Sequence, residues 1–78
     1  MREKKQYLVF AFASTTDAMA MEKRCGEEGI PGRLIPVPRE ITAGCGLAWR
    51  ILQTEYEESQ TKPESLGLSF SSRTLLWL

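Results

Sequence analysis

The stretch YLVFAF, residues 7–12, is an almost unbroken run of apolar and aromatic side chains. Runs of this kind are typical of a strand that has a neighbour on each side and is covered by helices. Directly after it, Ser14 offers a hydroxyl for a helix N-cap, with the carboxylate of Asp17 three residues further on. The stretch therefore predicts a central strand that leads straight into a helix.

This helix is expected to run through the segment DAMAMEKRCGEE and to stop at Gly29, since a residue without a Cβ adopts a left-handed conformation easily. Within it, Ala18, Met21 and Cys25 fall on one face at helical spacing. Unpaired cysteine is among the most buried residue types. We therefore expect Cys25 to be a small core residue.

Two further strands are predicted on either side of a loop. The strand from Leu34 to Pro38 contains Pro36 and Pro38, which lack N–H groups and restrict it to the edge of a sheet. The segment GLAWRIL alternates over residues 47–52, which suits a strand with Trp49 in the core. Together they would form a hairpin across the loop REITAGC, residues 39–45.

The remainder predicts a second helix near residues 54–65, short or kinked at Pro63, and a last strand in LSFSSRTLLWL, residues 68–78. Trp77 is then either a sheet residue or part of an exposed patch. The order β-α-β-β-α-β is that of the ferredoxin-like, split β-α-β arrangement. We expect this α+β fold, an antiparallel sheet with two helices on one face, with the first and third strands central.

Length and charge exclude several classes of protein. A chain of 78 residues predicts a single domain over residues 1–78, with residues 1–5 as a solvated leader and a thin core. Its 10 basic and 10 acidic residues leave no electrostatic footprint for nucleic acid. No run approaches the roughly 18 apolar residues that span a membrane, and no secretory signal is recognisable. We expect a cytoplasmic protein, and the thin core makes a homo-oligomer plausible.

The residue types available for chemistry are limited. The chain has no histidine, which excludes Ser-His and Cys-His nucleophile pairs. Its two cysteines lack a metal-ligand spacing, and no glycine-rich phosphate loop follows a strand. We therefore expect no metal and no cofactor, and we do not expect a self-sufficient enzyme.

Cys45 stands between Gly44 and Gly46 in a polar loop, where burial of a side chain is hard to arrange. The glycines either supply positive φ for the hairpin connection or let another protein approach the sulfur, and both readings can hold together. Backbone N–H groups of the loop, with Arg39 or Arg50, would favour a thiolate. Such a thiolate can receive a sulfur atom and surrender it again by exchange, without a base.

The segment GIPGRLIPVPREITAGCGLA, residues 29–48, resembles the Se/S carrier-like family of small bacterial proteins. Its specific features are the pattern P-x-P-R-x-I followed by C-G-L-A, and the likeness extends over residues 15–51. The resemblance implies a ferredoxin-like fold, with Cys45 as the residue that holds a persulfide or perselenide. Similar domains are associated with sulfur relay and with selenium-dependent enzyme maturation.

Three hypotheses follow. In the leading one, Cys45 receives sulfur or selenium from a donor such as a cysteine desulfurase and delivers it to an acceptor protein, which docks at Arg39, Gly44 and Gly46. The second is a small regulatory domain that dimerises through its open sheet face and binds a metabolite. The third is a redox switch, in which Cys25 and Cys45 form a disulfide.

Overall fold

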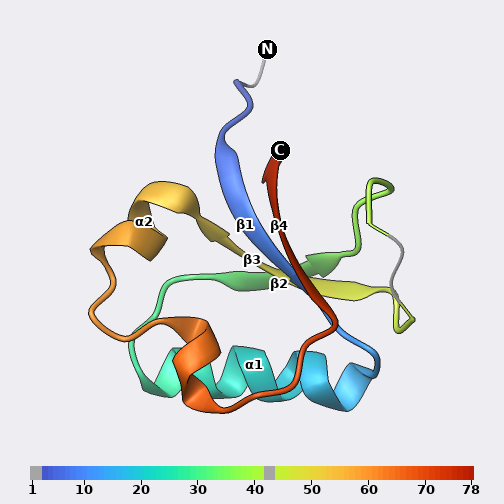
Figure 1. Cartoon of the computed structure of the whole chain (residues 1–78), viewed down its shortest axis with the longest axis horizontal. Coiled ribbons are helices and arrows are strands. Elements are labelled where there is room, and N and C mark those ends of the chain that lie inside the picture. The colour runs from blue at the N-terminus through green and yellow to red at the C-terminus, as the bar shows by residue number, and fades with distance from the viewer. Residues whose placement is uncertain (1–2, 42–43) are drawn as a thin grey trace.

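The computed structural model describes residues 3–41 and 44–78 (Figure 1). Four strands form one antiparallel sheet in the order β2-β3-β1-β4. This is the predicted ferredoxin-like α+β arrangement, with the first and third strands central and the proline-bearing second strand at an edge. The elements are β1 (Gln6–Ala11), α1 (Thr15–Glu27), β2 (Arg33–Pro36), β3 (Leu47–Leu52), α2 (Gln53–Glu58), the 3-10 helix η1 (Pro63–Leu66) and β4 (Ser72–Trp77).

Both ends of α1 are formed as the sequence predicts. At the start, Ser14 Oγ accepts a hydrogen bond from the backbone N–H of Asp17 at 3.2 Å. At the end, Gly29 is left-handed with φ of 71° and donates its N–H to the carbonyl of Gly26, while Ile30 donates to the carbonyl of Cys25 at 2.8 Å. These two bonds form a Schellman motif, which satisfies the last carbonyls of the helix.

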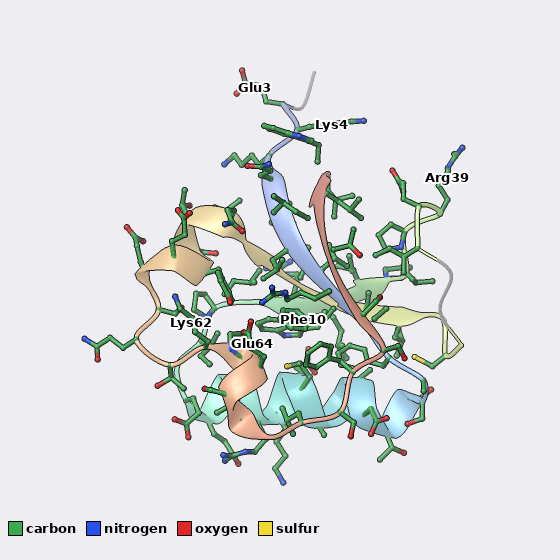
Figure 2. All side chains as sticks on the ribbon, viewed as in Figure 1. Glu3, Lys4, Phe10, Arg39, Lys62 and Glu64 are labelled. Carbon is green, nitrogen blue, oxygen red and sulfur yellow. The ribbon has the colours of Figure 1, made fainter. Side chains whose placement is uncertain are left out.

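The main core lies between the sheet and α1. Trp49 and Phe10 have no exposed surface, and their rings meet edge to face with centroids 5.8 Å apart. Figure 2 shows Phe10 between the sheet and α1. The predicted burial of Cys25 and Trp49 is confirmed. The buried members of this cluster are Leu8, Phe10, Phe12, Ala18, Met21, Cys25, Ile30, Trp49 and Ile51.

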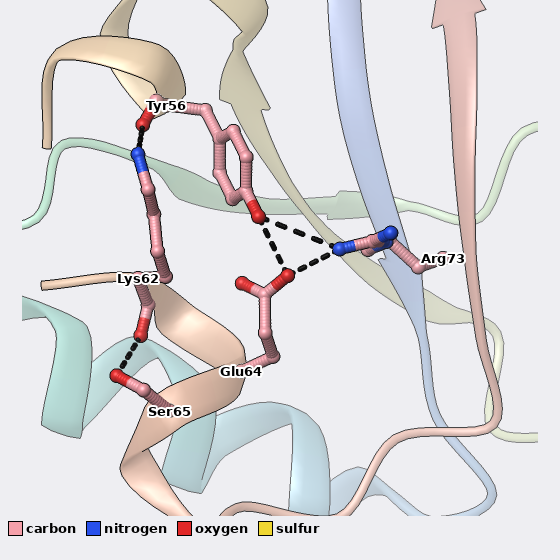
Figure 3. Close-up of polar contacts among 5 residues, drawn as sticks. All are labelled: Tyr56, Lys62, Glu64, Ser65 and Arg73. Carbon is pink, nitrogen blue, oxygen red and sulfur yellow. Dashed lines mark hydrogen bonds and ion pairs between the residues drawn. The ribbon is translucent and has the colours of Figure 1, made fainter.

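The second helix is shorter than expected. α2 ends at Glu58, and Pro63, which cannot donate an N–H inside a helix, instead begins η1. Lys62 connects the two pieces, since its Nζ donates to the carbonyl of Tyr56 (Figure 3) and also to that of Glu57 at the end of α2. Tyr56 and Leu66 pack against the same core cluster as α1, so α2 and η1 lie on the same face of the sheet as α1.

A polar cluster ties α2, η1 and β4 together (Figure 3). Tyr56 Oη donates to Glu64 Oε2 at 2.6 Å, and Arg73 forms an ion pair with the same carboxylate oxygen. Burial raises the pKa of Glu64, but hydrogen bonds from Tyr56, the backbone and Arg73 outweigh burial and hold that pKa below its ordinary value. Burial and the bond to Glu64 raise the pKa of the Tyr56 phenol.

The last strand is also shorter than the predicted segment. β4 begins at Ser72, and Phe70 before it packs edge to face on Phe10 with ring centroids 5.1 Å apart. Both readings of Trp77 hold, since it is the last residue of β4, opposite Gln6 of β1, and its surface is 60% exposed. Of the predicted leader, residues 3–5 are exposed and residues 1–2 lie outside the described ranges. Lys5 nevertheless exchanges two backbone hydrogen bonds with Leu78, both of 2.9 Å.

The opposite face of the sheet carries a second, smaller cluster. Val9, Ala11 and Ala48 are fully buried there, and Ile41 from the loop between β2 and β3 packs on them. This loop therefore folds back over part of the face that the helices leave open. Within the part of the chain that is described, no helix combines the length and the apolar character needed to cross a membrane.

Candidate functional site

Cys45 lies just before β3, at the end of the loop between β2 and β3. Its side chain is half-buried and packs against the core cluster on the α1 side of the sheet. Residues 44–46 and 37–41 of this loop are described, whereas residues 42–43 lie outside the described ranges. The thiol thus has an intermediate position, neither free in solution nor enclosed in the core.

A backbone group contacts the sulfur directly. The N–H of Leu47 donates to Cys45 Sγ at 3.4 Å, and the thiol lies 3.5 Å from the carbonyl oxygen of Leu47, to which it donates while protonated. Gly46 makes this possible, since its φ of 80° turns the chain so that the next N–H points back toward the sulfur. The sulfur therefore contacts one backbone donor and one backbone acceptor, both of Leu47.

Position 44 is occupied by glycine for a different structural reason. A Cβ placed on Gly44 would come within 3.3 Å of the carbonyl oxygen of Ala13, the residue before the N-cap of α1. The loop is therefore seated against the turn that starts α1, and a side chain at position 44 would push it away. The expected positive φ is therefore confirmed for Gly46 but is wrong for Gly44, where the close approach to Ala13 is the constraint instead. Their exposed surfaces leave the approach of a partner open.

The two arginines expected near the sulfur lie elsewhere. Arg39 is exposed at the opposite end of the loop, and its side chain points away from α1 and from the start of β3 (Figure 2). Arg50 stacks its guanidinium over the ring of Tyr7 at 4.3 Å, on the sheet face that points away from α1. The expectation that Arg50 assists the thiolate is wrong, because alternation along β3 turns it to the other face.

Cys25 contrasts with Cys45. It is 1% exposed, and its thiol donates to the Met21 sulfur at 3.5 Å. Burial raises the pKa of the Cys25 thiol to about 11, although the charge of Arg24 acts in the opposite direction. The group therefore remains a neutral thiol at physiological pH and is not a nucleophile.

The two thiols are also not brought together. The segment that carries Cys45 lies against the beginning of α1, as the contact of Gly44 with Ala13 and Figure 1 show. Cys25 is eleven residues beyond Ser14, which corresponds to about 16 Å along the helix axis. A disulfide requires Cα atoms within about 7 Å. Both cysteines are free, and the geometry does not favour the redox-switch hypothesis.

The structure also bears on a metal site and on a dimer formed through the open sheet face. Among residues 3–41 and 44–78, no three potential metal-ligating side chains come together. On the sheet face away from α1, an open hollow of about 540 Å³ is lined by Glu3, Lys5, Tyr7, Ile35, Arg50 and Leu78. The central part of that face is covered by Ile41, so a dimer formed across the whole face would first have to displace the loop.

A family model described as "Putative Se/S carrier protein-like" matches residues 7–72. The chain belongs to this family. The match runs from β1 to the first residue of β4 and includes the whole loop that carries Cys45, so it is wider than the likeness seen in residues 15–51. No curated protein and no solved structure matches the chain. Membership in a Se/S carrier family implies partners for transfer in general.

The sequence did not identify Leu47 as the residue whose backbone contacts the Cys45 sulfur. The pattern of an acceptor side chain followed two residues later by a donating N–H is well known for aspartate, asparagine, serine and threonine. Cysteine is not normally among these residue types. The Cys45-Gly46-Leu47 triplet could have indicated the contact, but only with the positive φ of Gly46 in hand.

Proposed function

We propose that this member of the Se/S carrier family holds sulfur or selenium as a persulfide or perselenide on Cys45 and delivers it from a donor protein to an acceptor protein. The observation that supports this most directly is the hydrogen bond from the Leu47 N–H to Cys45 Sγ. It fixes the position of a half-buried sulfur in an exposed loop, and exchange with a persulfide is a reaction that such a sulfur can carry out without a base. The family membership over residues 7–72 agrees with this role.

The transfer needs neither a base on this chain nor an external oxidant. The Cys45 thiolate attacks the outer sulfur of a persulfide on the donor, such as a cysteine desulfurase, and a new S–S bond forms on Cys45. The S–S bond of the donor breaks, and its cysteine leaves as a thiolate. In the second step the acceptor attacks the outer sulfur, and Cys45 leaves as the thiolate with which it began. The same exchange applies to selenium.

The position of the second cysteine protects such a cargo. A neighbouring thiolate would attack the persulfide, release sulfide and leave a disulfide on the carrier. Cys25 is buried, remains protonated and lies several helical turns from the start of α1. It is therefore a core residue that does not compete for the transferred atom.

We assign the docking of partners to the exposed parts of the loop between β2 and β3. Gly44 and Gly46 present little side-chain bulk on either side of Cys45, so that a partner's main chain can approach. Arg39 is exposed in the turn closed by the bond from the Ile41 N–H to the Pro38 carbonyl, at 3.0 Å. There it is a charged contact at the rim of the docking area, at a distance from the sulfur itself.

Loading by a cysteine desulfurase tests the proposal. The purified protein is incubated with the desulfurase and cysteine, and the intact mass is then measured with and without a reducing agent. Wild type and Cys25→Ala are expected to gain one sulfur atom that reduction removes, whereas Cys45→Ser gains none. An equal gain on Cys45→Ser, or no gain on the wild type, contradicts the proposal. A parallel reaction with selenocysteine and a selenocysteine lyase compares the two cargoes.

The contact with Leu47 leads to a separate prediction. Alanine at position 46 must adopt a left-handed conformation, which costs about 1–2 kcal/mol for a residue with a Cβ. Relaxation of this strain would move the Leu47 N–H off the sulfur, and the loss of a hydrogen bond to a charged group is expected to slow loading about tenfold. The initial rate of sulfur gain measures this effect.

Gly26 provides the matched control for Gly46. It lies within α1, and a Cβ there meets no atom within 4 Å among those considered. Gly26→Ala is expected to stabilise the helix by about 0.5–1 kcal/mol and to leave the loading rate unchanged. If both alanine variants load as fast as wild type, the Leu47 N–H has no role in the reactivity of Cys45.

A further inference from the structure

The two outer edges of the sheet differ in their capacity to bind another strand. β2 spans four residues and has Pro36 at its end, and proline cannot donate to a ladder. β4 spans six residues without proline, and among the described residues it pairs with β1 alone. Natural proteins normally protect such an edge. β4 is therefore the edge at which a further strand can be added.

The backbone groups that are free on β4 can be identified from its register with β1. Lys5 and Leu78 exchange both N–H to carbonyl bonds, which makes them a hydrogen-bonded pair of the antiparallel ladder. Such pairs alternate with non-hydrogen-bonded pairs, so Leu76 and Thr74 also direct their N–H and C=O groups toward β1. Arg73, Leu75 and Trp77 consequently direct theirs outward, away from β1.

The same three residues share one face of the sheet. They lie opposite Phe10, Leu8 and Gln6 of β1, so their side chains are on the side of the main core. Leu75 is 45% exposed and Trp77 is 60% exposed, and Arg73 is the only charged residue of β4. The free edge therefore offers two large apolar side chains and one guanidinium in a row.

We propose that a second copy of this chain pairs with this edge, β4 against β4 in antiparallel orientation, with a twofold axis at Leu75. In this register Leu75 faces Leu75 of the other copy, and Arg73 faces Trp77. Each of these positions is one whose N–H and C=O point outward, so the ladder between the copies closes without a change in either monomer. The two four-stranded sheets become one continuous sheet.

The side chains favour this occupant and this register. Directly opposite positions bring the two Leu75 side chains together and place each Arg73 guanidinium beside a Trp77 ring, which is the preferred aromatic partner for a cation. Arg73 already forms an ion pair with Glu64 of its own chain, so the positive charge that it adds to the interface is compensated. An unrelated peptide would need the same sequence of an aromatic, an apolar and a basic residue to match as well.

The proline substitution Leu75→Pro tests the pairing selectively. The N–H at position 75 points away from β1, so its loss leaves the β1–β4 ladder intact but removes both bonds at the axis. The dissociation constant of the dimer, measured by sedimentation over a range of concentrations, is expected to rise about a hundredfold. Thr74→Pro is the matched control, because it removes an N–H that bonds to β1 and is expected to unfold the protein.

Two further variants decide the outcome if Leu75→Pro fails to fold. Leu75→Lys keeps the N–H but places two like charges opposite each other, and it is expected to weaken the dimer about tenfold or more. Leu75→Cys, in a background of Cys25→Ala and Cys45→Ser, is expected to form a disulfide-linked dimer on mild oxidation. Directly opposite residues in a hydrogen-bonded pair have Cα atoms about 5.5 Å apart.

Arg73→Cys in the same background is the control for the crosslink. Position 73 faces position 77 of the other copy, so the two introduced cysteines would be about 13 Å apart and no crosslink is expected. A wild-type protein that remains a monomer at all concentrations overturns the proposal. A dimer that survives Leu75→Lys unchanged, or that is crosslinked equally well through position 73, also overturns it.

Discussion

Alanine in place of Gly32 is expected to lower the free energy of unfolding by about 2–3 kcal/mol, because it overpacks the core beside Trp49. A Cβ at position 32 would lie 2.1 Å from Cζ2 of the Trp49 ring and 2.6 Å from its Cε2 and Cη2 atoms. The ring is fully buried against Phe10 and has little room to move. Either the ring or the link between α1 and β2 must therefore shift.

Urea denaturation measures the effect of Gly32→Ala, with Gly26→Ala as a control that adds the same methyl group in open space. A double-mutant cycle with Trp49→Phe assigns the cause, since the smaller ring lacks the atoms that the new Cβ would meet. In the Trp49→Phe background, Gly32→Ala is expected to cost less than about 1 kcal/mol. An equal cost in both backgrounds would show that the clash with Trp49 is not the reason.

The second large effect is expected in alkaline solution. Burial raises the pKa of Cys25 to about 11 in the folded chain, whereas in the unfolded chain it ionises near the ordinary value of 9.0. The unfolded state therefore loses this proton first, and stability falls with rising pH over this interval. The contribution is complete below about pH 9 and disappears as the pH passes about 11. Its size is on the order of 2–3 kcal/mol.

Free energies of unfolding measured between pH 8 and pH 11 for wild type and Cys25→Ala test this prediction. The raised pKa of Tyr56 acts in the same direction near the upper end of the range, and it remains in the variant. The slope of stability against pH is expected to be shallower in Cys25→Ala, whatever its absolute stability. Parallel slopes would mean that Cys25 ionises as easily in the folded protein as in the unfolded one.

The candidate site was only partly predictable. The setting of Cys45 between two glycines indicated the residue and its loop, and the wider match to the Se/S carrier family covers that segment. The sequence did not predict that Leu47 contacts the sulfur, nor that Arg50 lies on the sheet face that points away from α1. Both depend on backbone directions set by the left-handed Gly46 and by the alternation of β3.

Local chemistry was sufficient for much of the fold. Four features act through neighbouring residues or through a missing N–H, and can therefore be predicted from the sequence. They are the apolar run of β1, the Ser14 cap, the helix end at Gly29 and the edge position of Pro36. By contrast, the contact of Gly32 with Trp49 depends on groups that are distant in the chain. The free edge at Leu75 likewise follows from pairing with β1. Only the assembled tertiary structure decides these features, because packing and register are set between elements.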